Sequence, residues 1–395
     1  MSVAVLRGDA RHLPLPDNSV DLIVTSPPYF GLRSYTDGGV HYDGQIGSEA
    51  TPGEWVAALV ACTAEWMRVL KPSGSLFVNL GDKYNSAASG QKAQQRHLQF
   101  GTGKWHNDPQ LRRFGEISGA PPKSLLGLPW RYALACTDQL GLILRAEIIW
   151  AKPNGLPESV QDRVRRVHEQ VFHFTLQPRY YSAVDEIREP AITSASGDKG
   201  YAKLPGSVWS IPSQPLTVPP ELGVDHFAAF PMELPRRIIT GWSPVGICTQ
   251  CGQGRRPVAD AAYVPIGNRL NNRRVTGLQA LGNSGHGRPG GPDSRLGDAR
   301  KDVTITGYAC GCGTWPIDAV QPSTRPSVVL DPFGGTGTTA LLAHALGRHG
   351  ITIDMSADYS RLAQWRTTDR GELARALQVD KPEAPIDGQE PLFSL

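Results

Sequence analysis

The chain has 395 residues, of which 40% are hydrophobic and 19% are charged, a balance typical of a folded globular protein. Its formal net charge is only +3, so any nucleic-acid-binding surface must be a local patch. The first residues lack a charged leader followed by an apolar segment, and no apolar run is long enough to span a membrane. We therefore expect a cytoplasmic protein with no membrane partner.

Short apolar runs alternate with helical spacing over the first 80 residues. We expect strands at 2–7 and 20–25, a helix at 53–70, a turn at 71–74 and a strand at 75–80. This order of elements predicts a parallel sheet with helices on its faces.

The same alternation resumes later in the chain. The expected strands are 144–150, 169–175, 327–330 and 350–353, and the expected helices are 129–140, 233–242, 338–346 and 359–365. The fold class is therefore α/β, a doubly wound and mostly parallel sheet with loop-rich insertions. Residues 83–122 are expected to be an inserted loop, and residues 253–305 a flexible surface rich in glycine and arginine.

A glycine-rich turn lies between two predicted strands near the C-terminal end of the sequence. Residues 328–339 read Val-Val-Leu-Asp-Pro-Phe-Gly-Gly-Thr-Gly-Thr-Thr, and the next strand ends in Asp354. Glycine is needed where backbone approaches a ligand, and a carboxylate at Asp354 could hold ribose hydroxyls. No lysine follows Gly337, which disfavours a phosphate loop, and the dinucleotide G-x-G-x-x-G pattern is absent. A purely structural turn is the remaining alternative.

Two motifs give the chain a family resemblance. The segment Asp331–Thr339 resembles the S-adenosylmethionine motif of amino-group DNA methyltransferases, and Thr25-Ser-Pro-Pro-Tyr29 is similar to their catalytic motif. The catalytic motif comes first, which resembles the permuted order called the beta class. Matching segments run from about residue 3 to 82, 124 to 243 and 327 to 365.

The resemblance implies S-adenosylmethionine as cofactor. In the permuted order the N-terminal strand would bring Asp9 to the adenine end, and Phe230 would pack beside the methionine part. A turn-forming role for Asp9 and a core role for Phe230 are the alternatives. The expected cofactor-binding residues are Asp9, Thr25, Phe230, Asp331, Pro332, Phe333, Gly334, Gly335, Gly337, Thr338 and Asp354.

The Ser-Pro-Pro-Tyr segment suits methyl transfer to an exocyclic amino group. Such a nitrogen is a weak nucleophile and is stacked inside a duplex, so the base must be flipped out. The oxygens of Ser26 and the Pro27 carbonyl can accept the amino hydrogens, Pro28 restrains the backbone, and Tyr29 can stack on the base. We expect these four residues to be catalytic. A rigid turn that ends a strand is the alternative.

Serine at the first position of the tetrapeptide determines the expected target. Within the family, Ser-Pro-Pro-Tyr is associated with cytosine N4 and Asp-Pro-Pro-Tyr with adenine N6. The expected function is therefore site-specific methylation of cytosine N4 in double-stranded DNA, in a restriction-modification setting where a cognate restriction enzyme acts separately. The alternatives are an adenine-N6 enzyme, an enzyme acting on RNA or a protein amide, and a catalytically silent DNA-binding protein.

Residues 150–169 resemble the family's segment beside the target pocket. Lys152, Arg163, Arg165 and Arg166 are expected to contact DNA phosphates, and a solvated charged face is the alternative. Base readout is expected in the irregular regions 83–122 and 182–225.

Four of the six cysteines form two tight pairs. Cys248 and Cys251 form a C-x-x-C pair, Cys310 and Cys312 form a C-x-C pair, and 58 residues separate the pairs. Both pairs are flanked by glycines and bracket a segment without an evident core, which favours one structural zinc ion. Free thiols or a redox pair are the alternative.

These features divide the chain into eight segments. They are a catalytic half (1–82), an inserted loop (83–122), a continuation of the catalytic domain (123–181), a target-recognition region (182–225), a cofactor-side segment (226–247), a zinc-clipped insertion (248–312), a cofactor-binding half (313–377) and a tail (378–395).

Overall fold

The computed structural model describes most of the chain. The described residues are 3–31, 36–37, 40–41, 44–85, 120–155, 157–158, 160–192, 199–223, 230–265, 299–310, 312 and 322–381. Four parts of the predictions lie outside the described residues. They are most of the inserted loop, the stretch 226–229 before Phe230, the centre of the flexible surface and most of the tail. No helix within these ranges is both long and apolar enough to cross a bilayer.

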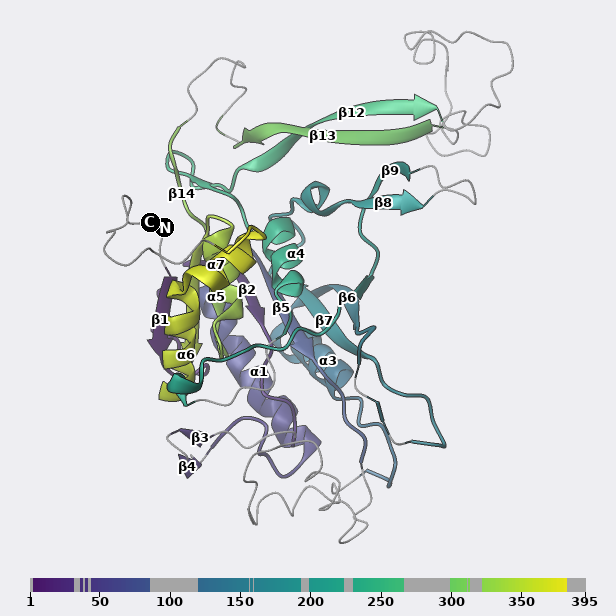
Figure 1. Cartoon of the computed structure of the whole chain (residues 1–395), viewed down its shortest axis with the longest axis vertical. Coiled ribbons are helices and arrows are strands. Elements are labelled where there is room, and N and C mark those ends of the chain that lie inside the picture. The colour runs from purple at the N-terminus through teal and green to yellow at the C-terminus, as the bar shows by residue number, and fades with distance from the viewer. Residues whose placement is uncertain are drawn as a thin grey trace. The chain divides into compact units, whose positions relative to one another are not determined.

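The chain divides into two compact units, the first comprising residues 1–183, 206–255 and 310–395. This first unit is built on an eight-stranded sheet (Figure 1). Its spatial order is β1 (Val3–Arg7), β16 (His349–Asp354), β15 (Val328–Asp331), β2 (Val20–Thr25), β5 (Leu70–Leu80), β7 (His168–Thr175), β6 (Ile143–Ala151) and β10 (Val208–Ser210). Within this sheet only β7 runs against its neighbours. The predicted doubly wound, mostly parallel α/β sheet is confirmed.

Two groups of helices pack on the sheet. Helix α1 (Pro52–Val69) packs against α3 (Leu128–Leu140), whereas α5 (Thr338–Ala345) packs against α4 (Glu233–Trp242), α6 (Ala357–Thr368) and α7 (Arg370–Leu377). The crossovers β2–α1–β5 and β15–α5–β16 lead in opposite directions along the sheet. Because such crossovers are right-handed, α1 and α5 cover opposite faces.

The strand order also explains how the permuted sequence closes into one sheet. Strand β1 pairs in parallel with β16, with Arg7 opposite Asp354, so the first strand of the chain adjoins one of the last. Strands β15 and β2 are neighbours whose helices lead away from each other. Such a switch point opens a crevice at the carboxyl ends of the strands, where ligands bind in doubly wound folds.

The predicted turn at residues 71–74 is wrong as a break between helix and strand. Strand β5 begins at Leu70, directly after α1. Its pairing with β2 shifts from Val20–Leu70 to Leu22–Ser75, so the four residues bulge out of register instead of ending the strand. Gly74 fits this bulge, because a Cβ there would lie 2.9 Å from the Asp21 carbonyl oxygen.

The second unit comprises residues 184–205 and 256–309 and contains two antiparallel ribbons. One pairs β12 (Arg256–Pro265) with β13 (Ala299–Ala309), and the other pairs β8 (Glu189–Ile192) with β9 (Lys199–Lys203). The prediction of flexible surface over 253–305 is therefore wrong at both ends of that segment. The alternating Val303-Thr-Ile-Thr306 pattern favours a strand, but glycine and arginine dominate the composition around it.

Candidate active site

A pocket opens at the carboxyl edge of the sheet in the first unit. Turns that follow β1, β2, β15 and β16 contribute to its lining. Eight of the predicted cofactor-binding residues line it: Asp9, Phe230, Pro332, Phe333, Gly334, Gly335, Thr338 and Asp354. Ser26 and Pro28 of the catalytic tetrapeptide line the same pocket. Segments far apart in the sequence thus meet in one cavity.

The predicted ligands Asp331 and Thr25 lie beneath the pocket and do not line it. Asp331 is 1% exposed and accepts hydrogen bonds from Thr25 Oγ1 at 2.7 Å and Thr339 Oγ1 at 2.9 Å. It also accepts the Phe333 backbone N–H at 3.1 Å. Burial raises the pKa of Asp331 to about 6, and the charge of Asp354 adds to this rise while the three hydrogen bonds oppose it. Asp331 therefore joins the ends of β15 and β2 and shapes the turn.

The glycine turn is shaped by close packing and left-handed backbone. A Cβ on Gly334 would lie 1.6 Å from Thr352 Oγ1, which no side chain could tolerate. Gly337, with φ +73°, is the N-cap of α5, and a Cβ there would lie 3.0 Å from that of Ala363. Gly335 lines the pocket, with φ +47° and open space where a side chain would stand. The turn thus presents backbone to a ligand.

The acidic end of β16 is bonded to this turn. Asp354 Oδ2 accepts the Gly335 N–H at 2.9 Å, and Oδ1 accepts the Ser356 N–H at 2.9 Å. Asp354 is also one of the residues that line the pocket. It therefore holds the glycine turn at the wall of the pocket.

A buried arginine supports the glycine turn from α6. Arg366 donates to Thr336 Oγ1 at 2.8 Å and to Thr338 Oγ1 at 2.6 Å, and its Nε lies 2.9 Å from Glu372 Oε2. Both partners of this ion pair have side chains that are about 5% exposed or less. Removing one partner would leave a buried charge uncompensated, so the pair fixes the turn strongly.

Asp9 lies in the pocket wall but is already bonded to Arg11. The Arg11 guanidinium lies 2.6 Å from Asp9 Oδ2, and its backbone N–H donates to Oδ1 at 2.9 Å. Burial raises the pKa of Asp9, but the hydrogen bonds and charge of Arg11 outweigh it and leave the pKa below its usual value. Asp9 is thus an ionised acceptor whose partner is Arg11.

The Ser-Pro-Pro-Tyr turn after β2 is held by side chains from other elements. The Pro28 carbonyl accepts Trp55 Nε1–H from α1 at 3.0 Å, and Pro27 is buried. The ring of Tyr29 packs over Gly81, where a Cβ would lie 2.7 Å from it. Ser26 Oγ lies 3.3 Å from the Tyr29 hydroxyl.

Tyr29 and Ser26 belong to a polar network that the sequence did not reveal. The Tyr29 hydroxyl donates to Glu169 Oε2 at 2.6 Å. Asn79 Nδ2 donates to the same carboxylate oxygen at 2.8 Å and to the Tyr29 hydroxyl at 2.9 Å. Lys152 forms an ion pair with the other oxygen of Glu169. The catalytic turn thus rests on one buried amide and one ion pair.

Three of the four predicted DNA-contacting cations are engaged within the protein. They form ion pairs as Lys152 with Glu169, Arg163 with Glu158, and Arg166 with Asp82. The Arg163 guanidinium also stacks 3.7 Å from the centre of the Tyr84 ring. Arg165 is exposed to solvent. Of the four, Arg165 is therefore the best placed to meet a phosphate.

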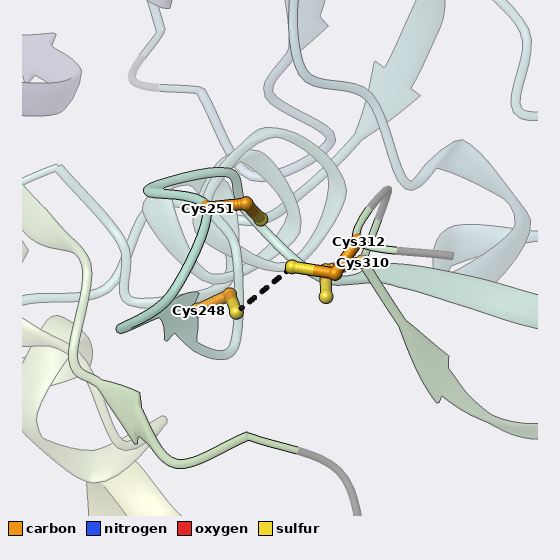
Figure 2. A group of neighbouring side chains, drawn as sticks. All are labelled: Cys248, Cys251, Cys310 and Cys312. Atoms are coloured by element: carbon orange, nitrogen blue, oxygen red, sulfur yellow. Dashed lines mark hydrogen bonds between the residues drawn. The ribbon is translucent and has the colours of Figure 1, made fainter. Parts of the chain in front are cut away.

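The four paired cysteines converge on one point in the first unit (Figure 2). Their sulfur atoms all lie within 4.8 Å of one another, and Cys248 Sγ lies 3.6 Å from Cys312 Sγ. Backbone N–H groups of Cys251 and Gln250 hydrogen-bond to the Cys248 sulfur and lower its pKa to about 6. The cluster therefore offers four thiol ligands, one of them readily ionised.

Sequence reasoning missed Asn79 and Glu169, although each carries a signal. Asn79 is the polar residue in the otherwise apolar, fully buried run Leu76–Leu80, and Glu169 sits at the start of the buried strand β7. A polar group inside a buried strand must find a partner, which marks it for attention. Which partner it finds depends on the strand order β2–β5–β7–β6, which the sequence pattern does not give.

Comparisons with known proteins point to one family. The profile of a family described as DNA methylase, covering N6 and N4 enzymes, matches residues 20–247 and 319–365. Type II methyltransferase M.XycI from Xanthomonas campestris pv. cyanopsidis is 40% identical over 225 residues, 57% of this chain and 67% of that protein. Type II methyltransferase M.SmaI from Serratia marcescens is 29% identical over 378 residues, 93% of this chain and 92% of that protein.

The fold has a counterpart among solved structures. The PvuII DNA methyltransferase (cytosine-N4-specific) aligns over 96% of this chain and 94% of its own, with a TM-score of 0.52 and 17% identity. Between the two segments that match the family lies the stretch 248–318, which contains the four clustered cysteines.

Proposed function

Because the chain belongs to the family of DNA methylases that act on N6 or N4 amino groups, we propose that it methylates cytosine N4 in double-stranded DNA, with S-adenosylmethionine as methyl donor. This membership confirms the resemblance carried by the two motifs. The observation that carries the proposal is the position of Ser26. It lines the pocket beside the glycine turn and lies 3.3 Å from the Tyr29 hydroxyl. Within the family, serine at this position is associated with methylation of cytosine N4.

The pocket fits S-adenosylmethionine, which when bound supplies a methyl group on a positively charged sulfur. Asp354 offers carboxylate oxygens to ribose hydroxyls, and Gly335 leaves space for close approach to the backbone. Phe230 would pack against the methionine part, and Asp9 would receive the adenine amino group beside Arg11. Asp331 and Thr25 would hold the floor of this site from below.

The catalytic turn prepares the target amine. Ser26 Oγ and the Pro27 carbonyl accept the two amino hydrogens, which aims the nitrogen lone pair at the methyl group. Tyr29, held against Gly81, stacks on the flipped base. Orientation supplies the catalysis, and no covalent bond between enzyme and base is needed.

We infer that the cysteine cluster binds one structural zinc ion. A tetrahedral site with zinc–sulfur distances of about 2.3 Å has sulfur–sulfur separations of about 3.8 Å. The distance of 3.6 Å between Cys248 and Cys312 is close to this value. Cys248 ends β11 (Ile247–Cys248) and Cys310 follows β13, so the ion would close the two ends of the inserted segment 256–309. This metal would have no catalytic role.

Arg165 would hold part of the DNA partner. It is exposed to solvent and lies close to Glu169 in the sequence. A phosphate contact from an exposed arginine supplies affinity without base specificity. A cognate restriction enzyme would recognise the same site and act as a separate protein.

Nucleoside analysis tests the proposed target. DNA from cells that express the protein is digested to nucleosides, which are identified by mass spectrometry. DNA from cells that express Ser26→Ala is the control. The expected product is N4-methylcytosine that depends on Ser26. If N6-methyladenine is the only product, the protein is an adenine-N6 methyltransferase instead. Cofactor binding without methylation of either base would support the alternative of a catalytically silent DNA-binding protein.

A further inference from the structure

A path of oxygen atoms leads from the reacting position to a partly buried carboxylate. Ser26 Oγ lies 3.3 Å from the Tyr29 hydroxyl, which donates to Glu169 Oε2 over 2.6 Å. The second contact is a short, strong hydrogen bond. The first is longer, as catalytic hydrogen bonds often are before substrate binds. The path therefore connects the amine acceptor to a group that can hold a proton.

Methyl transfer to an amine releases a proton that must be accommodated. The nitrogen–carbon bond forms as the sulfur–carbon bond breaks, and the nitrogen must then lose one of its two hydrogens as a proton. The Ser26 hydroxyl can retain that proton only by passing its own to a neighbour. The Tyr29 hydroxyl is such a neighbour.

We propose, on the basis of the proposed function, that Glu169 takes up the amine proton through Ser26 and Tyr29. The amine proton moves to Ser26 Oγ, the Ser26 proton to the Tyr29 oxygen, and the Tyr29 proton to Glu169 Oε2. Ser26 and Tyr29 remain neutral hydroxyl groups, and Glu169 becomes a neutral acid that later returns the proton to water. Because Glu169 acts through Tyr29, it is a positioning residue and does not touch the base.

The charge balance of the reaction is compatible with this role. The Lys152 and Glu169 side chains are 23% and 14% exposed, and Lys152 Nζ lies 4.3 Å from the centre of the Trp150 ring. The reaction removes the positive charge of the sulfonium and the negative charge of Glu169 together. The total charge of the site is therefore unchanged, which avoids the cost of building a net charge in a poorly solvated place.

Asn79 aligns the path and leaves an acceptor beside it. Its amide nitrogen lies 2.8 Å from Glu169 Oε2, 2.9 Å from the Tyr29 hydroxyl and 3.4 Å from Ser26 Oγ. Asn79 is 4% exposed, and no donor among the described residues reaches its Oδ1 atom. A buried acceptor without a donor is costly, so the three contacts of the Asn79 amide nitrogen are kept at some expense to stability.

The test compares two replacements of Glu169 in single-turnover transfer of a labelled methyl group to DNA. Glu169→Gln keeps the length of the side chain and loses its basicity, whereas Glu169→Asp keeps the carboxylate and shortens it. We expect Glu169→Gln to be slower by on the order of a hundredfold and Glu169→Asp to retain part of the lost rate. Cofactor and DNA dissociation constants, measured on the same preparations, should stay within about threefold of the parent.

Tyr29→Phe removes the hydroxyl in the middle of the proton path and provides a second, independent test. It should slow transfer to a similar degree, and the double variant with Glu169→Gln should be no slower than the slower single variant, since the path is already broken. The matched control is Tyr132→Phe, which removes another buried hydroxyl, 2.7 Å from Thr63 Oγ1 and far from Ser26 in sequence. This control should transfer at the parental rate.

The outcomes separate this inference from the function on which it rests. If Glu169→Gln is faster than Glu169→Asp, or if the losses of Tyr29→Phe and Glu169→Gln add in full, shape alone matters and the proton path is refuted. Parental protein that binds S-adenosylmethionine but methylates no DNA would refute the proposed function, and the inference with it.

Discussion

The glycine turn after β15 and the Ser-Pro-Pro-Tyr turn after β2 lie side by side at the edge of the sheet, yet they are held differently. The bonds that fix the glycine turn join Gly335 to Asp354, 19 residues away, and Thr336 to Arg366, 30 residues away. Tyr29 is held by partners 50 and 140 residues away. The glycine turn is thus coded locally, whereas the base side is assembled by the whole sheet.

This difference indicates how each side should respond to substitution. A substitution in the glycine turn changes its backbone or its nearest carboxylate, and we expect weaker ligand binding. A substitution among the distant side chains that hold the catalytic turn changes the orientation of groups that act only during the reaction, and we expect a lower rate of methyl transfer. The link between the two is the buried hydrogen bond from Thr25 to Asp331, which spans 306 residues.

The cofactor side can be tested by Asp354→Ala. We expect it to weaken S-adenosylmethionine binding by about 1–3 kcal/mol, roughly 5- to 150-fold, because hydrogen bonds to a charged acceptor are lost. The transfer rate at saturating cofactor should change far less. Asp358→Ala, which removes an ion pair with Arg361 on the same helix, is the matched control for calorimetry. Unchanged affinity in a folded Asp354→Ala protein would remove Asp354 from the site.

The cysteine cluster combines both forms of construction, since two local pairs meet across a long insertion. Metal analysis of protein purified without chelator should find one zinc ion per chain. Replacing Cys310 and Cys312 with serine should abolish zinc binding. It should also lower the melting temperature by at least about 4 °C, since each lost kcal/mol of unfolding free energy corresponds to roughly 2–4 °C in a domain of this size. Cys136→Ala should keep its zinc. Zinc that survives the double replacement would contradict the assignment.

The smallest expected effect concerns the DNA surface beside the catalytic turn. Arg165→Gln should weaken DNA binding by less than about 1 kcal/mol, equally for all sequences, and reduce the salt slope of the affinity by about one. Arg375→Gln on α7, where the arginine is partly exposed and paired with Glu372, serves as control. A salt slope identical to that of the parent would mean that Arg165 meets no phosphate.

The contrast between the two turns also explains what the sequence predicts well. Most strands and helices of the first unit, and the glycine turn, follow from hydrophobic periodicity and glycine spacing, which act over short distances. Placing Glu169 against Tyr29 requires knowing that β7 enters the sheet antiparallel between β5 and β6. Lys152 illustrates the same limit: as a lone cation it predicts a phosphate contact, but its partner Glu169 becomes evident only when β6 and β7 pair.

The most direct test of this division is Ser26→Ala, with the single-turnover methyl-transfer rate and the cofactor dissociation constant measured on one preparation. Ser26 is expected to act on the amine and not on S-adenosylmethionine. The rate should therefore fall on the order of a hundredfold, as for loss of one aligned acceptor, while the dissociation constant stays within about threefold. A parental rate, or a dissociation constant that rises as much as the rate falls, would contradict it.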